Sequence, residues 1–347
     1  MGTVVFVTMV LFDDVGSYPL PQGISREWIQ SAFKDPNQRD RLFEILQDAM
    51  RQKIDAGVII PTYPQFQEMN EQFLGIITQE EDSEPFVVKN EKAKIIELEA
   101  METVAKEYRD STGERMKTRI CVTGPIELHL KQLGSTIFGD ILQNLARSVD
   151  RFVKNSIEDA RDLEIYTLSI DEPSMGLNPD INIKRDDMVK ALGIASASAK
   201  RSGIDVEIHL HSPICYKPMC EVDGIGVLGI ESAANPHYLD VIDFSDLEGS
   251  DKFIRVGVSR TDIYAMAAQY NDEKNIDVWK DVNSIEGMIN HFNSSDTVLK
   301  RLKKAYDTFG DRIKYAGPDC GIGTWPSQKS AFTLLEYTGR GIREFNI

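Results

Sequence analysis

Eight short apolar runs rich in β-branched residues alternate along the chain with segments of helical periodicity, and this alternation strongly constrains the fold. The expected strands cover residues 4–11, 58–61, 118–123, 165–170, 206–210, 226–230, 253–258 and 313–316. Amphipathic segments lie between most of them, for example residues 40–56, 91–108, 138–163, 185–202, 297–309 and 327–339. Eight strand-then-helix units predict a closed (β/α)8 TIM barrel of the α/β class. An open doubly wound sheet is the alternative, but no dinucleotide-type glycine fingerprint follows the first run.

The spacing of the runs predicts where the barrel is extended. The chain has 347 residues, whereas a barrel of this kind commonly needs about 250. The long intervals follow the first and second strands, and the second interval, residues 62–117, is rich in acidic residues around 79–84. No Pro/Gly/Ser-rich linker divides the sequence. We therefore expect one catalytic barrel domain over residues 1–347, with insertions after strands one and two.

Composition excludes several classes of function. The chain carries 39 Lys and Arg against 55 Asp and Glu, a formal net charge of −16, which repels nucleic acid. The apolar N-terminus has no basic residue before it and no cleavage site after it, and no stretch reaches the roughly 20 apolar residues of a membrane span. We expect a cytoplasmic protein without nucleic-acid or membrane partners. The four cysteines are too scattered for a disulfide framework, so free thiols are expected, some of them metal ligands.

Polar segments follow the predicted strands, at the end where barrel enzymes place their active sites. These segments are GSYP (16–19), PTYPQ (61–65), TGP (123–125), IDEP (170–173), HLHSPIC (209–215), GIES (229–232), GVSRTD (257–262) and AGPDCG (316–321). Histidine, glutamate and cysteine in three of them suggest a zinc site, because thiolate and imidazole together favour zinc. His209 and His211 alternate with Leu210 and so point the same way. Ordinary strand-end polar residues and a small buried cysteine are the alternative, since no CxxC or HExxH signature is present.

Two adjacent carboxylates, Asp171 and Glu172, close the fourth predicted strand. Adjacent residues of a strand face opposite sides, so only one of them can enter the barrel mouth. A helix cap, in which Asp171 or Ser174 accepts backbone N–H bonds, is the alternative to a ligand-binding role. The residue pattern leaves both roles open.

Taken in order, the strand-end segments resemble the catalytic half of cobalamin-independent methionine synthase and its short archaeal relatives. The similarity extends over essentially the whole chain; IDEP and PDCG are its most specific pieces, and GSYP and GP are individually weak. The resemblance implies a barrel related in fold to uroporphyrinogen decarboxylase, which transfers a methyl group to homocysteine bound through sulfur to zinc. It also implies three metal ligands. Glu231 matches the family glutamate, Cys320 the cysteine of PDCG, and His211 the histidine of the shared I-H-x-H string.

The fourth metal ligand does not transfer directly from the family. Its members have His-x-Cys, whereas Ser212 and Pro213 follow His211 here. We expect Cys215, the next cysteine, to complete the site. The alternative is that His209 and His211 form the pair of ligands from this strand end.

The segment after the second strand bears on the acceptor substrate. Family members have a glutamate there that is thought to hold the amino group of homocysteine, and Tyr63 stands at this position. A neutral phenol does not neutralise an ammonium group. The resemblance leaves Asp171 to bind the amino group, with Gly16 and Ser17 contacting the substrate carboxylate. Homocysteine is the expected acceptor, and another thiol such as coenzyme M is the alternative.

The resemblance implies that the nucleophile is a zinc-activated substrate thiolate, with no protein nucleophile. A free thiol has a pKa of about 8.5, and a bound cation stabilises its thiolate. The long family members hold a folate donor with an N-terminal half that this chain lacks. A methylated corrinoid, supplied free or by a corrinoid protein, is therefore the expected donor. A metal-free porphyrin-type decarboxylase is an alternative from another reaction class, although few strand ends here are basic.

Overall fold

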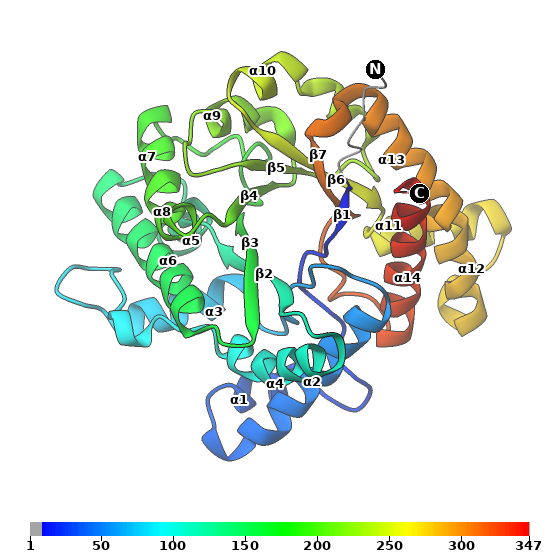
Figure 1. Ribbon diagram of the computed structural model, residues 1–347, viewed down its shortest axis with the longest axis horizontal. Coiled ribbons are helices and arrows are strands. Elements are labelled where there is room, and N and C mark those ends of the chain that lie inside the picture. Colours follow the sequence, from blue (N-terminus) through cyan, green and yellow to red (C-terminus); the bar gives the residue numbers. More distant parts are fainter. Residues whose placement is uncertain (1–8, 347) are drawn as a thin grey trace.

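Figure 1 shows the computed structural model, which describes residues 9–346 as a curled parallel sheet with helices around its outside. The described residues contain one seven-stranded sheet of order β1-β7-β6-β5-β4-β3-β2, and every adjacent pair is parallel. The strands are β1 (Leu11–Phe12), β2 (Met116–Thr123), β3 (Leu163–Asp171), β4 (Asp205–Leu210), β5 (Val227–Ile230), β6 (Phe253–Ser259) and β7 (Ile313–Pro318). The predicted α/β class and the strands corresponding to β2 through β7 are confirmed.

The prediction of eight regular strands is not confirmed in the described part of the chain. Residues 4–8 of the first predicted run lie outside it, and β1 has two residues. The second predicted run, 58–61, forms an isolated parallel bridge instead, from Ile60 to Asp13, and Thr62, just after the run, forms another with Arg119. Pro61 lies between these bridges and has no N–H group to donate, which explains why the ladder is interrupted there.

Helices cover the outer face of the sheet. They are α1 (Arg26–Ala32), α2 (Arg39–Asp55), α3 (Met69–Gln79), α4 (Ile96–Thr112), α5 (Pro125–Leu133), α6 (Gly139–Asp159), α7 (Arg185–Ala195), α8 (Ala197–Arg201), α9 (Tyr216–Cys220), α10 (Phe244–Gly249), α11 (Ile263–Lys274), α12 (Val282–Asn293), α13 (Ser295–Phe309) and α14 (Gln328–Phe345). The predicted helix 185–202 is divided into α7 and α8 at Ser196, whose hydroxyl donates to the carbonyl of Leu192. None of the described helices combines the length and apolar character that a membrane span requires.

The inside of the curled sheet is organised in layers along the strands. Near the amino ends, Ile60, Val227 and Tyr315 form a small apolar cluster. The next layer is a fully buried ion network made of Asp13, Arg119, Glu207 and Arg255. In this ion network the Arg119 guanidinium lies 2.6 Å from Asp13 and 2.9 Å from Glu207. Glu207 precedes His209 by two residues on β4, so the ion network directly underlies the next layer at the carboxyl ends.

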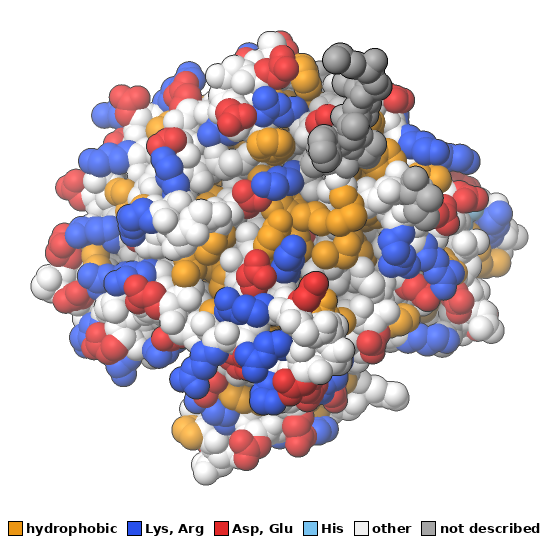
Figure 2. Space-filling model, in the orientation of Figure 1, with side chains coloured by type: hydrophobic (Ala, Val, Ile, Leu, Met, Phe, Trp, Pro, Cys, Tyr) orange, Lys and Arg blue, Asp and Glu red, His pale blue; other side chains and the backbone are white. Residues whose placement is uncertain are grey.

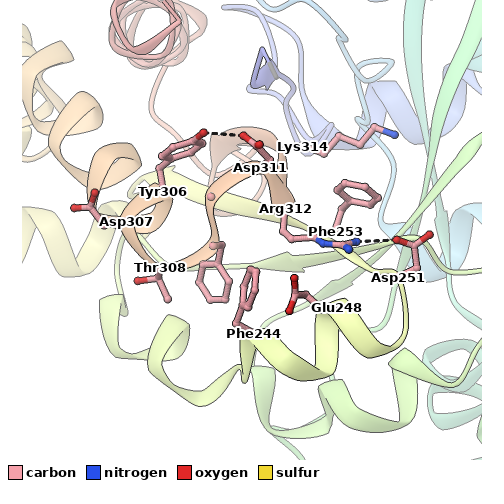
Figure 3. A pocket seen from close by; sticks show the side chains of 12 residues that line it. Phe244, Glu248, Asp251, Phe253, Tyr306, Asp307, Thr308, Asp311, Arg312 and Lys314 are labelled. Atoms are coloured by element: carbon pink, nitrogen blue, oxygen red, sulfur yellow. Dashed lines mark hydrogen bonds and ion pairs between the residues drawn. The ribbon is translucent and has the colours of Figure 1, made fainter. Parts of the chain in front are cut away.

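One face of the molecule, shown in Figure 2, carries interspersed acidic and basic side chains, with hydrophobic side chains gathered near its middle. A hollow of about 840 Å³ opens between α10 and the connection from α13 to β7 (Figure 3). It lies at the amino ends of β6 and β7, and its ionic groups include the Arg312–Asp251 pair at 2.8 Å. This hollow is therefore at the opposite end of the strands from the predicted site.

Candidate metal centre

Four potential metal ligands meet at the carboxyl ends of β4, β5 and β7. This ligand cluster consists of His209, His211, Glu231 and Cys320, whose ligand atoms all lie within 4.8 Å of one another. His209 is on β4, and Glu231 directly follows the last residue of β5. Because the strands are parallel, their carboxyl ends reach the same edge of the sheet and bring these side chains together.

The distances within the ligand cluster suit a tetrahedral zinc ion. The Nε2 atoms of His209 and His211 lie 3.5 and 3.4 Å from Glu231 Oε1, and His211 Nε2 lies 3.6 Å from Cys320 Sγ. Ligand bonds of about 2.0–2.3 Å in tetrahedral geometry separate neighbouring ligand atoms by about 3.3–3.6 Å. The donor set, two imidazoles, one carboxylate and one thiol, is also one that zinc accepts.

Two atoms at the centre of the ligand cluster, both able to bind a metal, are buried without a hydrogen-bond partner in the structure. They are His209 Nε2 and Glu231 Oε1, both at the centre of the group. Buried polar atoms are nearly always satisfied, and leaving one unpaired costs about 1–3 kcal/mol. A metal ion bound by both atoms would satisfy them, so the residues present fit a metal. His209 Nδ1 is also unpartnered, and it lies 3.8 Å from Glu207 Oε1 in the ion network.

The electrostatics of the ligand cluster favour charged ligands. Burial raises the pKa of Cys320, but His209 and His211 outweigh it and hold that pKa below its ordinary value. Burial likewise opposes ionisation of Glu231, and the same two histidines hold its pKa low. Burial lowers the pKa of each histidine, yet Cys320 above all raises both, with help from Glu231. Replacing two imidazolium protons by one divalent cation would leave the net charge of the cluster unchanged.

Cys215 lies outside the ligand cluster, which instead contains the alternative ligand His209. Strand alternation places His209 and His211 on one side of β4. Pro213 then begins a 3-10 turn, Pro213–Cys215, that leads into α9. The Cys215 thiol is only partly buried, and burial raises its pKa. Three of the four preferred ligands are thus brought together, and the fourth member of the ligand cluster is His209.

Gly16 and Ser17 lie against the segment that carries Cys320. The carbonyl of Ser17 accepts from Ile322 N at 3.0 Å, and its hydroxyl accepts from Gly323 N at 3.2 Å. Gly16 has a φ of +105°, in the region that favours glycine. The buried Lys53 ammonium fixes this turn by donating to the Gly16 carbonyl at 2.9 Å. Both predicted substrate-binding residues therefore lie beside the ligand cluster.

The side chains of Asp171, the last residue of β3, and of Glu172, the next residue, point in opposite directions. Asp171 is the register partner of His209, so its side chain leaves the sheet on the same face as the ligand cluster. Ser169 donates to it at 2.6 Å. Glu172 faces the other way and accepts from the backbone N–H groups of Ile126 and Glu127, in the first turn of α5. Glu172, rather than Asp171 or Ser174, is thus the side chain that binds a helix N-terminus.

Tyr63 is fully buried, and its hydroxyl donates to the carbonyl of Cys121 at 2.7 Å. Its neighbour Gln65 is only partly buried and pairs with Ser17 through an isolated bridge. A Cβ atom on Gly16 would lie 2.6 Å from Gln65 Oε1, so the Gln65 amide closely borders the Gly16 turn. Gln65 is a candidate that sequence reasoning missed, although it ends the PTYPQ segment. The structure does not place Tyr63 at an accessible surface of the site.

Comparisons with known proteins support the fold. No family model matches the chain, and no curated protein matches it. Among solved structures, one similar protein is "a B12-independent methionine synthase from Shewanella sp. W3-18-1 in complex with Selenomethionine", with a TM-score of 0.61 and 14% identity over 97% of each chain. A Xaa-Pro dipeptidase with bound methionine in its active site covers 100% of this chain and 77% of its own, at a TM-score of 0.41 and 10% identity. The first similarity shows that this chain shares the fold of that methionine synthase.

Proposed function

We propose that the chain is a zinc-dependent methyltransferase that methylates the thiol of homocysteine and forms methionine. The observation that carries this proposal is the ligand cluster, with ligand-atom separations of 3.4–3.6 Å and two unpartnered buried atoms at its centre. The fold similarity to a methionine synthase crystallised with selenomethionine adds support, because that ligand is the selenium analogue of the proposed product.

The four residues of the ligand cluster would hold the zinc ion. Bound there, zinc would act as a Lewis acid that stabilises the substrate thiolate, the form that attacks a methyl carbon. Because four protein ligands already fill a tetrahedral ion, the substrate sulfur would enter as a fifth ligand or in place of one of the four. His209 and His211 are neutral donors once deprotonated, while Glu231 and Cys320 each contribute one negative charge. The donor set therefore neutralises a divalent cation. In this proposal the nucleophile is the substrate thiolate and not a protein side chain.

The residues around the ligand cluster would bind the rest of an amino-acid substrate. Asp171 faces the same side as His209 and offers a carboxylate to the ammonium group. The Gly16–Ser17 turn, held by Lys53 against the Cys320 segment, offers polar contacts to the substrate carboxylate. An anionic sulfonate such as that of coenzyme M gains nothing from Asp171, which makes homocysteine the better acceptor. Because Tyr63 is buried, it would not contact the substrate, and its hydrogen bond to the Cys121 carbonyl would only support the backbone beside the site.

We infer that the methyl donor is a methylated corrinoid, free or carried by a corrinoid protein. The similar methionine synthase is described as B12-independent, so a methylated folate is the donor to test beside it. A porphyrin-type decarboxylase would leave the ligand cluster without a role, and we do not favour it.

We also propose that the chain has the architecture of a complete (β/α)8 barrel. Residues 60–62 would take the place of the strand that is missing from a (β/α)8 barrel, the second in chain order, with the whole chain as one catalytic domain. Support comes from two backbone hydrogen bonds on opposite sides of this segment. Ile60 N donates to the carbonyl of Phe12 at 3.0 Å, and Arg119 N donates to that of Pro61 at 3.1 Å.

The test is methyl transfer by zinc-loaded protein from methylcobalamin, or from a methylated folate, to homocysteine and to coenzyme M. We expect methionine to form, and we expect the Cys320→Ser variant to lose both zinc and activity. Transfer to coenzyme M alone would contradict the assignment of homocysteine. Undiminished transfer by Cys320→Ser would contradict the metal-centred proposal.

A further inference from the structure

Asp319 directly precedes Cys320, and its carboxylate reaches across to the segment that follows Glu231. Its two oxygens accept from Ala233 N at 2.8 Å and from Ala234 N at 2.7 Å, and the side chain is buried. These amides lie two and three residues beyond Glu231. One buried side chain therefore connects the β7 end that carries Cys320 with the β5 end that carries Glu231.

This connection passes over β6, which lies between β5 and β7 in the sheet. Gly257 of β6 leaves the room for it, because a Cβ atom there would lie 1.8 Å from Asp319 Oδ1. Two further hydrogen bonds hold the three strand ends together. Asp319 N donates to the carbonyl of Ser259 at 2.9 Å, and the Ser232 hydroxyl donates to that of Gly257 at 2.8 Å.

We propose that Asp319 is a positioning residue that fixes the separation of Glu231 from Cys320 and thereby sets the affinity of the site for its metal. This inference rests on the proposed zinc site. A tetrahedral site tolerates only small errors in the positions of its ligand atoms, and outer residues that orient ligands commonly change metal affinity 10–100-fold. Asp319 acts through backbone amides on both sides of the site and does not itself belong to the ligand cluster.

The experiment measures the Zn²⁺ dissociation constant by competition with a chromophoric chelator, together with the visible spectrum of the Co²⁺-loaded protein. We expect Asp319→Asn to weaken Zn²⁺ binding about 10–100-fold, because an amide offers one acceptor oxygen where two N–H groups need partners. The cobalt spectrum should change as well, since it reports the thiolate and the ligand geometry. Thermal unfolding of the metal-free proteins provides the measure of folding.

Glu172→Gln is the matched control. Glu172 is also buried and also accepts from two backbone amides, at 2.9 and 2.7 Å, but those amides belong to α5 and not to a ligand-bearing segment. The Glu172→Gln substitution should lower thermal stability while leaving the Zn²⁺ dissociation constant unchanged. An equal loss of Zn²⁺ affinity in Glu172→Gln and Asp319→Asn would overturn the inference, because it would show a general effect of stability.

A double-mutant cycle gives a second, independent test. Gly257→Ala should weaken Zn²⁺ binding although Asp319 is present, because the new methyl group displaces the carboxylate. Added to Asp319→Ala, it should cost less than it does in the wild-type background, because the 1.8 Å overlap with the carboxylate is gone and the nearest remaining atom of residue 319 would be its Cα at 3.1 Å. The inference would be overturned if the two substitutions lowered Zn²⁺ affinity independently, so that their effects multiplied in the double variant. Wild-type Zn²⁺ affinity in Asp319→Asn would overturn it as well. Failure of the wild-type protein to bind zinc would instead overturn the proposed function on which the inference rests.

Discussion

Asp171 on β3 and His209 on β4 are register partners, and their side chains leave the sheet on the same face, beside the ligand cluster. This pairing places a carboxylate next to the proposed metal without making it a ligand, since Asp171 is not among the four clustered residues. Its Ser169 hydrogen bond, at 2.6 Å, holds the carboxylate on that side. The substrate ammonium is the cation that we expect it to meet.

Asp171→Asn should therefore raise the KM for homocysteine, by about tenfold or more, because a charge-assisted hydrogen bond contributes about 1.5–3 kcal/mol. Zinc content should not change. Steady-state kinetics together with metal analysis test this prediction, and Ser169→Ala, which removes only the supporting hydroxyl, should have a smaller effect. A loss of zinc in Asp171→Asn would show that this residue belongs to the metal site.

Lys53 is a fully buried ammonium that donates to Asp14 Oδ2 at 2.7 Å and to the carbonyls of Gly16 and Thr62, both at 2.9 Å. Lys53→Met should lower the free energy of unfolding by about 3–5 kcal/mol, because it leaves the buried Asp14 carboxylate without its cationic partner. Urea unfolding measures the loss. The double variant Lys53→Met/Asp14→Asn should recover part of it, whereas an unchanged midpoint in the single variant would refute this account of the turn.

Glu97 on α4 is fully buried, and burial raises its pKa from 4.5 to about 7 despite hydrogen bonds from Gln67 and Gln72. The folded state therefore holds this proton more tightly than the unfolded state. The stability that protonated Glu97 contributes is present below about pH 4.5 and is lost as the pH rises through about 7.

Glu97→Gln, which resembles the protonated form, should stabilise the protein at pH 8 by up to about 3 kcal/mol and have little effect at pH 4. Urea unfolding at pH 4 and pH 8 measures the change in the free energy of unfolding and so tests this prediction. Glu99→Gln, on the exposed side of the same helix, is the control and should show the same small effect at both. A stabilisation by Glu97→Gln that does not depend on pH would contradict the argument.

Local patterns were sufficient to predict much of the fold and part of the site. Apolar runs located β2 through β7, and two-residue alternation predicted that His209 and His211 face one side. The second predicted strand, 58–61, is not a regular strand, because it contains Pro61, which cannot donate to a ladder. The preference for Cys215 stays a prediction; the turn that begins at Pro213 leaves Cys215 outside the ligand cluster.

Other features depend on contacts between segments that are distant in the sequence. Asp319 reaches Ala233 and Ala234 across β6, some 85 residues earlier in the chain, and only the space left by Gly257 allows it. No local pattern contains that relationship. Tyr63 was likewise predicted to contact the substrate, yet its hydroxyl donates a hydrogen bond to the carbonyl of Cys121 in the core.

The most direct test of the central claim is the zinc content of the wild-type protein and of the His209→Ala and Cys215→Ser variants, measured after removal of loosely bound metal. We predict about one zinc ion per chain in the wild-type protein and in Cys215→Ser, since the ligand cluster supplies four ligands without Cys215. His209→Ala should lose the ion. Zinc retained in His209→Ala and lost in Cys215→Ser would contradict the assigned ligands, and a wild-type protein that binds none would contradict the proposed function.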